Sequence, residues 1–179
     1  MVFSTISLRY ATALIELSNE RGITDAVYSD MLEMKNLLLE SEELRNFLKT
    51  PQIDDKAKAR LISKLFSEHF QDITVRFFSL LTRKGRSKLV IYIVHQFVEL
   101  YRKQNGIVSA VVKTATCMSD ETKQKIIEKV RQATGKDQIE LTEYIDKTLL
   151  GGFILYYDGN CYDASVKRNL NKIKNILTV

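Results

Sequence analysis

Apolar residues recur at steps of three and four through most of positions 4–105. This spacing is typical of amphipathic helices, because residues three and four apart lie on one helical face. The pattern breaks at Gly22, Pro51 and Gly85, which are typical helix-ending residues. It therefore predicts six helices with short connections, over residues 4–20, 24–40, 41–50, 54–66, 72–84 and 87–105. Such helices favour an antiparallel bundle.

Polar residues at the predicted helix starts are candidate N-caps, since their side chains can accept a hydrogen bond from a free backbone N–H group. Across the whole chain the candidates are Thr24, Ser41, Asp54, Ser87, Ser119 and Asp163. The fourth predicted helix carries Ala57, Leu61, Leu65 and Phe66 on its apolar face.

The fifth predicted helix is more apolar than one buried stripe requires, and the sixth is nearly unbroken over residues 89–94. A wide apolar face belongs either to a helix at the centre of a bundle or to one that also binds a partner. The pattern leaves both interpretations open.

After Gly106 the period changes. Residues 107–115 and 139–145 predict strands, and a helix between them begins after Ser119 and ends at Gly135. A third strand over 153–157, a turn at Asp158–Asn160, a short strand and a final helix complete the chain. We predict a mainly α fold: a bundle domain over 1–105 and a small α/β domain over 106–179 with two helices on its sheet.

Three glycines in this second part lie where the backbone turns. Gly151 and Gly152 are adjacent and precede the third strand, and Gly159 lies in the hairpin turn. Paired glycines can hold a ligand or let another element pack closely. The spacing is not that of a dinucleotide fingerprint, and no G-K-[ST] follows. We therefore assign all three glycines a structural role.

The residue types present give little indication of a catalytic or metal-binding site. Cys117 and Cys161 form no C-x-x-C pair, and His69 and His95 belong to different parts of the predicted bundle, without an acidic or cysteine cluster nearby. No nucleophile motif is present. We therefore expect no catalytic residue, no cofactor and no metal site. No stretch approaches the roughly 18 apolar residues of a membrane span, and no signal peptide is recognisable.

The chain carries 27 basic and 22 acidic residues, a net charge of +5, and a pI near 9.1. A basic protein that binds nucleic acid is therefore one alternative function. A generic helical adaptor is another. The charge forms no basic block, so the argument for nucleic acid is weak.

Five stretches, in this order and spacing, are similar to one known family: 9–14 (RYATAL), 47–53 (FLKTPQI), 85–86 (GR), 145–153 (IDKTLLGGF) and 163–170 (DASVKRNL). Together they resemble the delta subunit of F-type ATP synthases, whose mitochondrial counterpart is the oligomycin sensitivity-conferring protein. The resemblance covers nearly the whole chain. Ala164 stands where relatives often have glycine or serine, and Lys167 where many have arginine.

The resemblance implies a non-catalytic stator subunit that links the catalytic headpiece to the peripheral stalk. The N-terminal domain would bind the N-terminal helix of an alpha subunit in a groove between the first and fifth helices. The anchors implied are Tyr10, Ala13, Leu14, Leu17, Phe77, Leu80 and Leu81. An acidic substitution at Leu14, Leu17 or Leu80 is expected to weaken this binding without unfolding the domain.

The C-terminal domain would bind the b subunits of the stalk. The stalk-binding candidates are Lys167, Arg168, Lys172 and Lys174. The family implies a protein that is monomeric when isolated and that binds no nucleic acid. It would lie on the cytoplasmic face of a bacterial inner membrane, attached through its partners.

Overall fold

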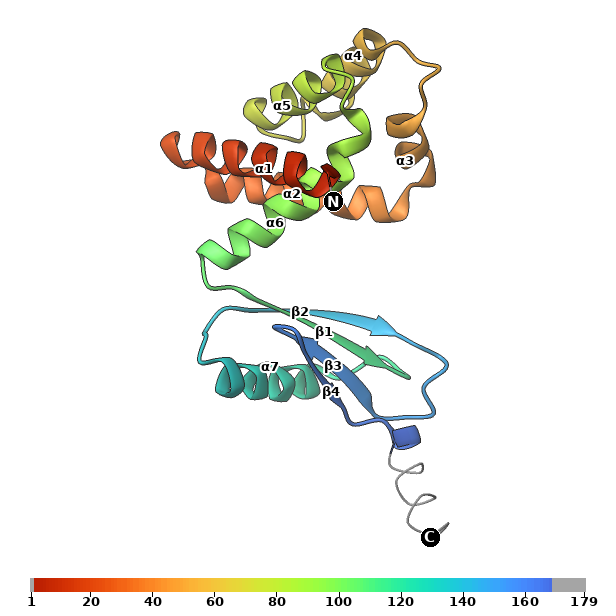
Figure 1. The fold of residues 1–179 in the computed structure, drawn as a ribbon. Helices are drawn as coiled ribbons and strands as arrows, with labels where there is room; N and C mark the ends of the chain where they lie inside the picture. The colour runs from red at the N-terminus through yellow and green to blue at the C-terminus, as the bar shows by residue number, and fades with distance from the viewer. Residues whose placement is uncertain (1, 169–179) are drawn as a thin grey trace. The chain divides into compact units, whose positions relative to one another are not determined.

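The computed structural model describes residues 2–168, and the side chains of residues 5–168 (Figure 1). The prediction of a mainly helical chain with a small sheet near its C-terminal end is confirmed. The chain divides into two compact units, Met1–Tyr101 and Arg102–Val179. The division falls inside a helix, whereas the sequence places the domain boundary after residue 105.

The N-terminal unit consists of helices joined by short turns. They are α1 (Val2–Glu20), α2 (Thr24–Glu40), α3 (Glu42–Lys49), α4 (Asp55–Phe66), α5 (Asp72–Arg83), a short 3-10 turn (Ser87–Leu89) and α6 (Val90–Gln104). Each predicted helix is present within a few residues of its expected bounds. Gly22 and Gly85 have φ of 66° and 67°, so they end α1 and α5 in the left-handed conformation that glycine adopts readily.

Three predicted caps are confirmed. The side chain of Ser41 accepts from the Leu44 N–H at 3.1 Å, and that of Asp54 accepts from the Lys56 N–H at 3.1 Å. Ser119 accepts from the Thr122 N–H at 3.3 Å and caps the helix of the second unit. These caps were predictable because both partners lie within three residues of each other.

The other three cap predictions are wrong, because each side chain bonds elsewhere. Thr24 is the first residue of α2, and its hydroxyl donates to Asn19 Oδ1 at 2.6 Å. The Ser87 hydroxyl donates to the Leu48 carbonyl at 2.7 Å. Asp163 accepts from the Ser165 N–H at 2.8 Å, and Ser165 in turn accepts from the Arg168 N–H at 3.2 Å. The last helix is therefore capped by Ser165.

The predicted inner face of α4 is also wrong in part. Leu61 and Leu65 are exposed, whereas Ala59, Ile62 and Phe66 are buried. The α4 helix packs beside α5, where the hydroxyl groups of their serines lie 2.8 Å apart. Apolar residues occupy two faces of α4, so a spacing of three and four fits either face.

The core of the N-terminal unit draws on most of its helices. Its largest fully buried side chains are Phe78, Phe97, Leu14, Ile15, Met31, Leu81 and Ile93. Tyr28 of α2 stacks on Tyr101 at the end of α6 with ring centroids 3.9 Å apart, and the Tyr101 hydroxyl donates to Asp25 at 2.6 Å.

The C-terminal unit is a four-stranded sheet with a helix on one face (Figure 1). Its elements are β1 (Val108–Thr114), α7 (Asp120–Thr134), β2 (Ile139–Ile145), β3 (Phe153–Tyr157) and β4 (Asn160–Asp163). The strand order is β2-β1-β3-β4, with β1 and β2 parallel because α7 connects them, and the other pairs antiparallel. Alternate residues of β1 pack with Leu155 against Ile126 and Val130 of α7. The second covering helix that the sequence predicts lies mostly outside the described residues.

The three glycines shape the backbone around β3. Gly152 has φ of 77°, and a Cβ atom there would lie 2.3 Å from the Ala164 carbonyl oxygen. The Gly151 carbonyl accepts from the Val166 N–H at 3.0 Å. Asp158 and Gly159 both have positive φ, as a two-residue type I′ hairpin turn requires. The glycine pair therefore lets the segment after β4 lie against the chain that enters β3.

Candidate docking surface on α1 and α5

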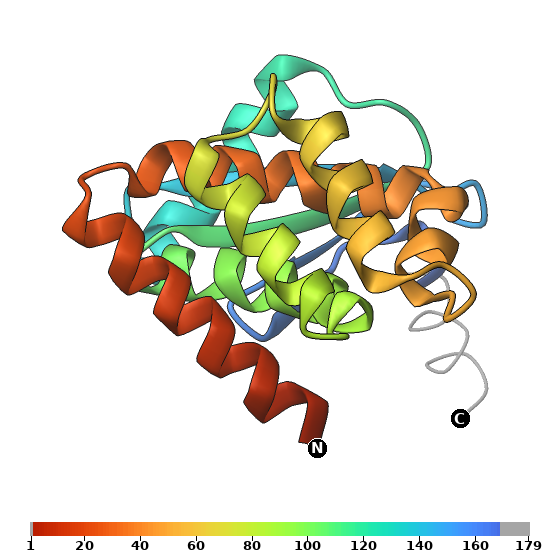
Figure 2. The ribbon, with the colours of Figure 1, turned by 90° about the horizontal axis from the view of Figure 1, so that it is seen from above.

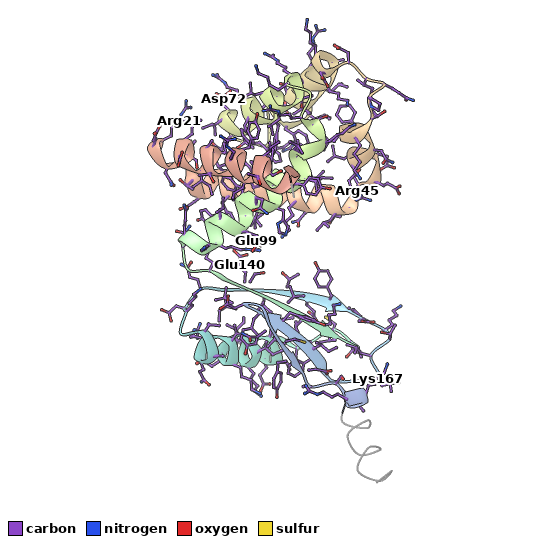
Figure 3. The ribbon with its side chains drawn as sticks, viewed as in Figure 1. Arg21, Arg45, Asp72, Glu99, Glu140 and Lys167 are labelled. Atoms are coloured by element: carbon purple, nitrogen blue, oxygen red, sulfur yellow. The ribbon has the colours of Figure 1, made fainter. Side chains whose placement is uncertain are left out.

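The helices α1 and α5 run side by side in opposite directions (Figures 1 and 2). Tyr10 of α1 contacts Phe77 of α5 edge to face, with ring centroids 6.2 Å apart and planes at 66°. Arg21, just after α1, and Asp72, at the start of α5, lie at the same end of the pair (Figure 3). The start of α1 is therefore next to the end of α5.

The predicted anchors fall into two groups. Leu14 and Leu81 are 2% and 0% exposed, so they belong to the core. Leu17 and Leu80 are 39% and 48% exposed, and Ala13 is exposed beside them. An acidic residue at Leu14 would bury an unpaired charge, so the expectation that it leaves the domain folded is wrong.

Five predicted anchors remain accessible and form what we call the α1–α5 surface: Tyr10, Ala13, Leu17, Phe77 and Leu80. The three on α1 are spaced three and four apart, and the two on α5 are spaced three apart, so each set lies along one flank of its helix. Tyr10 and Phe77 are half-buried in their mutual contact. Together the two sets form an apolar stripe along the neighbouring flanks of α1 and α5.

Arg86 adds a cation to this surface. Its guanidinium lies 5.4 Å from the centre of the Tyr10 ring and donates a hydrogen bond to the Tyr10 hydroxyl. Cation–π contacts of this kind stabilise by about 0.5–1 kcal/mol at exposed sites. Sequence analysis assigns Arg86 no role beyond its place in a family motif, because its partner lies 76 positions away.

Asp30 of α2 holds the first turn of α5 through two hydrogen bonds. Its carboxylate is buried and accepts from the Gln71 N–H at 2.8 Å and from the Thr74 hydroxyl at 2.6 Å. Burial raises the pKa of Asp30, although these two hydrogen bonds oppose the shift. Sequence reasoning missed this residue, since an acidic residue within α2 resembles any solvent-facing one.

The loops near the end of α5 are also tied to the neighbouring helices. The Ser87 hydroxyl holds the Leu48 carbonyl, and the buried Lys58 ammonium donates to the Thr50 carbonyl. The family-like stretch 47–53 therefore contacts Ser87, the residue that follows the stretch 85–86.

The stalk-binding candidates are only partly described. Lys167 and Arg168 are exposed at the start of the last helix. Figure 3 labels Lys167 there. The Arg168 guanidinium donates to the Asp163 carbonyl at 3.0 Å, so it also ties this start to β4. Lys172 and Lys174 lie outside the described residues.

Two carboxylates of the C-terminal unit have structural partners. Glu143 accepts from the Met118 N–H at 2.7 Å and pairs with Lys123 at 3.1 Å, and these bonds lower the pKa of Glu143. Asp146 accepts from the hydroxyl and N–H of Thr148, at 2.6 and 2.9 Å, which lowers the pKa of Asp146. Both carboxylates hold loops at the ends of strands, so their charges have a structural explanation.

Within residues 2–168, no cluster of three or more histidine, cysteine or acidic side chains has the arrangement of a metal site. In the same part of the chain, no helix has the length and apolarity needed to span a bilayer.

Comparison with known proteins identifies the family. The model of the ATP synthase delta (OSCP) subunit matches residues 6–177. The ATP synthase subunit delta of Cytophaga hutchinsonii is 33% identical, over 97% of this chain and 94% of that protein. The subunit delta of Crocosphaera subtropica is also 33% identical, over 99% and 96%.

A solved structure shares the fold. A chain of the Toxoplasma gondii mitochondrial ATP synthase hexamer, determined by cryo-EM, is similar with a TM-score of 0.75 and 22% identity, over 97% of both chains. The family match extends across both units and nearly the whole length of the relatives. This chain therefore belongs to the ATP synthase delta (OSCP) subunit family.

Proposed function

We propose that this protein is a non-catalytic stator subunit of an F-type ATP synthase, which links the alpha/beta headpiece to the peripheral stalk. The observation that carries this function is the family match over residues 6–177, which spans both units. A stator must resist the torque of the rotor, so that rotation changes the conformation of the catalytic subunits. A protein with one unit for the headpiece and a second unit for the peripheral stalk suits that role.

The N-terminal unit is proposed to act as an antiparallel six-helix bundle that binds the N-terminal helix of an alpha subunit on the α1–α5 surface. Two exposed leucines, Leu17 and Leu80, support this site, since large apolar side chains in contact with water favour burial by a partner. An amphipathic helix would place its own apolar residues against them. The Tyr10–Phe77 contact joins the two helices beneath this partner helix.

The C-terminal unit is proposed to bind the b subunits of the peripheral stalk. The exposed Lys167 and Arg168, followed in the sequence by Lys172 and Lys174, give the end of this unit a basic character. Such side chains would attract acidic side chains on a stalk helix, and this attraction would weaken with salt.

The protein is proposed to lie on the cytoplasmic face of a bacterial inner membrane, attached through its partners. The relatives with 33% identity are bacterial subunits, which supports a bacterial enzyme. Isolated from the complex, the protein is proposed to be a monomer.

Purification of the tagged protein from membranes of its source in mild detergent tests this function. We expect the alpha, beta and b subunits to accompany it in stoichiometric amounts. An untagged strain and a strain with a tagged unrelated peripheral protein are the controls. Recovery with nucleic acid instead, and without these subunits, would refute the stator function.

A further inference from the structure

The α1–α5 surface is basic at one end. Lys84, the residue that follows α5, continues the spacing of three and four that begins with Phe77 and Leu80. Arg83 precedes it, and Arg86 contacts Tyr10 from the following loop. On α1, Arg9 lies one turn before Ala13. All four basic side chains are exposed.

The positive charge at this end is only partly offset by nearby carboxylates. In the part of the chain that the structure describes, no carboxylate forms an ion pair with Lys84 or Arg86. Asp54 and Asp55, at the start of α4, line one hollow with Gly85, and the Asp55 carboxylate lies 3.4 Å from the position of a Cβ atom on Gly85. The four exposed basic side chains outnumber these two carboxylates, so the basic end presents net positive charge to a partner.

The opposite end of the surface has mixed charge. Asp72 at the start of α5 pairs with Arg76 at 2.9 Å. At the end of α1, Glu20 is followed by Arg21. These charges largely cancel, so the electrostatic potential changes along the length of the α1–α5 surface.

We infer that the α1–α5 surface binds an amphipathic helix in one direction only, with the helix end that carries negative charge over Lys84 and Arg86. The inference rests on the proposed function, in which a headpiece helix binds here. Apolar contacts with Tyr10, Leu17 and Leu80 hold the helix but do not fix its direction, because an apolar stripe is nearly symmetric end to end. The basic end supplies the asymmetry.

Two sources of negative charge suit this end. Acidic side chains near one end of the partner helix would pair with the ammonium and guanidinium groups. The C-terminal carbonyl groups of a helix carry about half a negative charge, which reinforces this placement when the acidic side chains lie near that end and opposes it when they lie near the N-terminus. Arg86 is prepared for this role, since Tyr10 orients its guanidinium and leaves further N–H donors available.

Arg86 and Lys84 are therefore specificity-determining residues of the α1–α5 surface. A helix with basic side chains at the corresponding end would meet like charges, which disfavours that direction. The length fits a short helix: α5 has 12 residues, or about 18 Å at 1.5 Å per residue.

The direction can be measured by NMR on the full-length protein labelled with ¹⁵N. The probe is a synthetic peptide copying the first 20 or so residues of the alpha subunit of the same source, with a nitroxide at one end or the other. We expect a nitroxide at the more acidic end to broaden the amide signals of Lys84 and Arg86. A nitroxide at the other end should broaden those of Gly22 and Asp72.

Charge reversals at the two ends give a matched comparison by calorimetry. Lys84→Glu should weaken peptide binding about three- to tenfold and reduce its salt dependence, in the range expected of exposed interfacial charges. Arg21→Glu, at the opposite end of the same surface, should leave the affinity within about twofold.

Equal broadening from both nitroxide positions, or equal losses from both reversals, would overturn the inference while leaving helix binding intact. Absence of any peptide binding would instead overturn the proposed binding site, and the inference with it. A peptide bound with its acidic end near Arg21 would also refute the inference.

Discussion

Gly152 and Gly159 have nearly the same backbone φ, 77° and 76°, but different surroundings. A Cβ atom on Gly152 would collide with the backbone of Ala164, whereas one on Gly159 would meet open space. Gly159→Ala should cost about 1–2 kcal/mol, the penalty of a left-handed conformation. Gly152→Ala should cost about 3 kcal/mol or more, because overpacking adds to that penalty. Denaturant unfolding of the two variants would measure the difference, and equal losses would contradict the close packing.

Asp30 provides a pH-dependent test. Because burial raises the pKa of Asp30 above its ordinary 3.8, the folded protein binds this proton more tightly than the unfolded chain does. The stability contributed by Asp30 is therefore fully present below the unfolded pKa and is lost as the pH rises through the folded pKa. The stability of the wild type relative to Asp30→Asn should accordingly increase as the pH falls from 7 towards 3.

Two substitutions at Asp30 separate the effect of its charge from the effect of its hydrogen bonds. Asp30→Asn keeps an acceptor for Gln71 and Thr74, so it should be tolerated near pH 7. Asp30→Ala leaves both donors unpaired and should cost about 1–3 kcal/mol. Urea unfolding at several pH values measures both variants. A wild-type advantage over Asp30→Asn that grows with rising pH would show that the direction of the pKa shift is wrong.

At the residue scale, the sequence predicts interactions that are local. Ser41, Asp54 and Ser119 cap their own helices, and both partners lie in the same turn. Ser87, Asp30 and Arg86 bond to residues about 40 or more positions away, and the identity of such partners depends on how helices pack. These residues were therefore misassigned or missed.

At the scale of secondary structure, periodicity locates helices better than it locates their partners. The α1 and α5 ranges follow from spacing and from Gly22 and Gly85. A helical period cannot separate a core flank from a docking flank, because Leu14 and Leu17 fit one apolar stripe equally well. Only packing shows that Leu14 is enclosed and that Leu17 is in contact with solvent.

The difference between enclosed and exposed leucines predicts that variants affect either stability or partner binding. Leu17→Gln and Leu80→Gln should each weaken binding of the alpha-subunit peptide by more than about 1 kcal/mol, as truncation of a central anchor does. Because both side chains are already exposed, stability should change by less than about 0.5 kcal/mol. Calorimetry and thermal unfolding provide the two measurements.

Leu65→Gln and Leu14→Gln are the controls. Leu65 is an exposed leucine on α4 and is not one of the five residues that define the α1–α5 surface, so its variant should bind normally. Leu14 is enclosed, so its variant should lose about 2–5 kcal/mol of stability. Normal peptide binding by both Leu17→Gln and Leu80→Gln would exclude the α1–α5 surface as the docking site.

At the scale of the whole molecule, α6 contributes residues to both compact units. Tyr101 stacks on Tyr28 in the N-terminal unit, whereas the Arg102 guanidinium pairs with Glu140 of β2 at 2.5 Å. The sequence places the boundary at Gly106, where the apolar period changes, because an ion pair across 38 positions leaves no periodic signal.

The boundary can be tested with two fragments. A fragment starting at residue 102 should be more stable than one starting at residue 106, by about 1–3 kcal/mol, because the latter leaves Glu140 without Arg102. Both should bind a b-subunit fragment and neither should bind the alpha-subunit peptide. Urea unfolding and pull-down assays measure these properties, and retention of the alpha peptide by either fragment would contradict the proposed division of roles.

The most direct test of the stator function is reconstitution of membrane vesicles that lack this protein. Without it, we expect the headpiece to hydrolyse ATP while ATP-driven ion pumping is lost. Addition of the wild-type protein should restore pumping, and either compact unit alone should not. Full pumping by vesicles free of this protein would contradict the account, since the link between headpiece and stalk would then not depend on it.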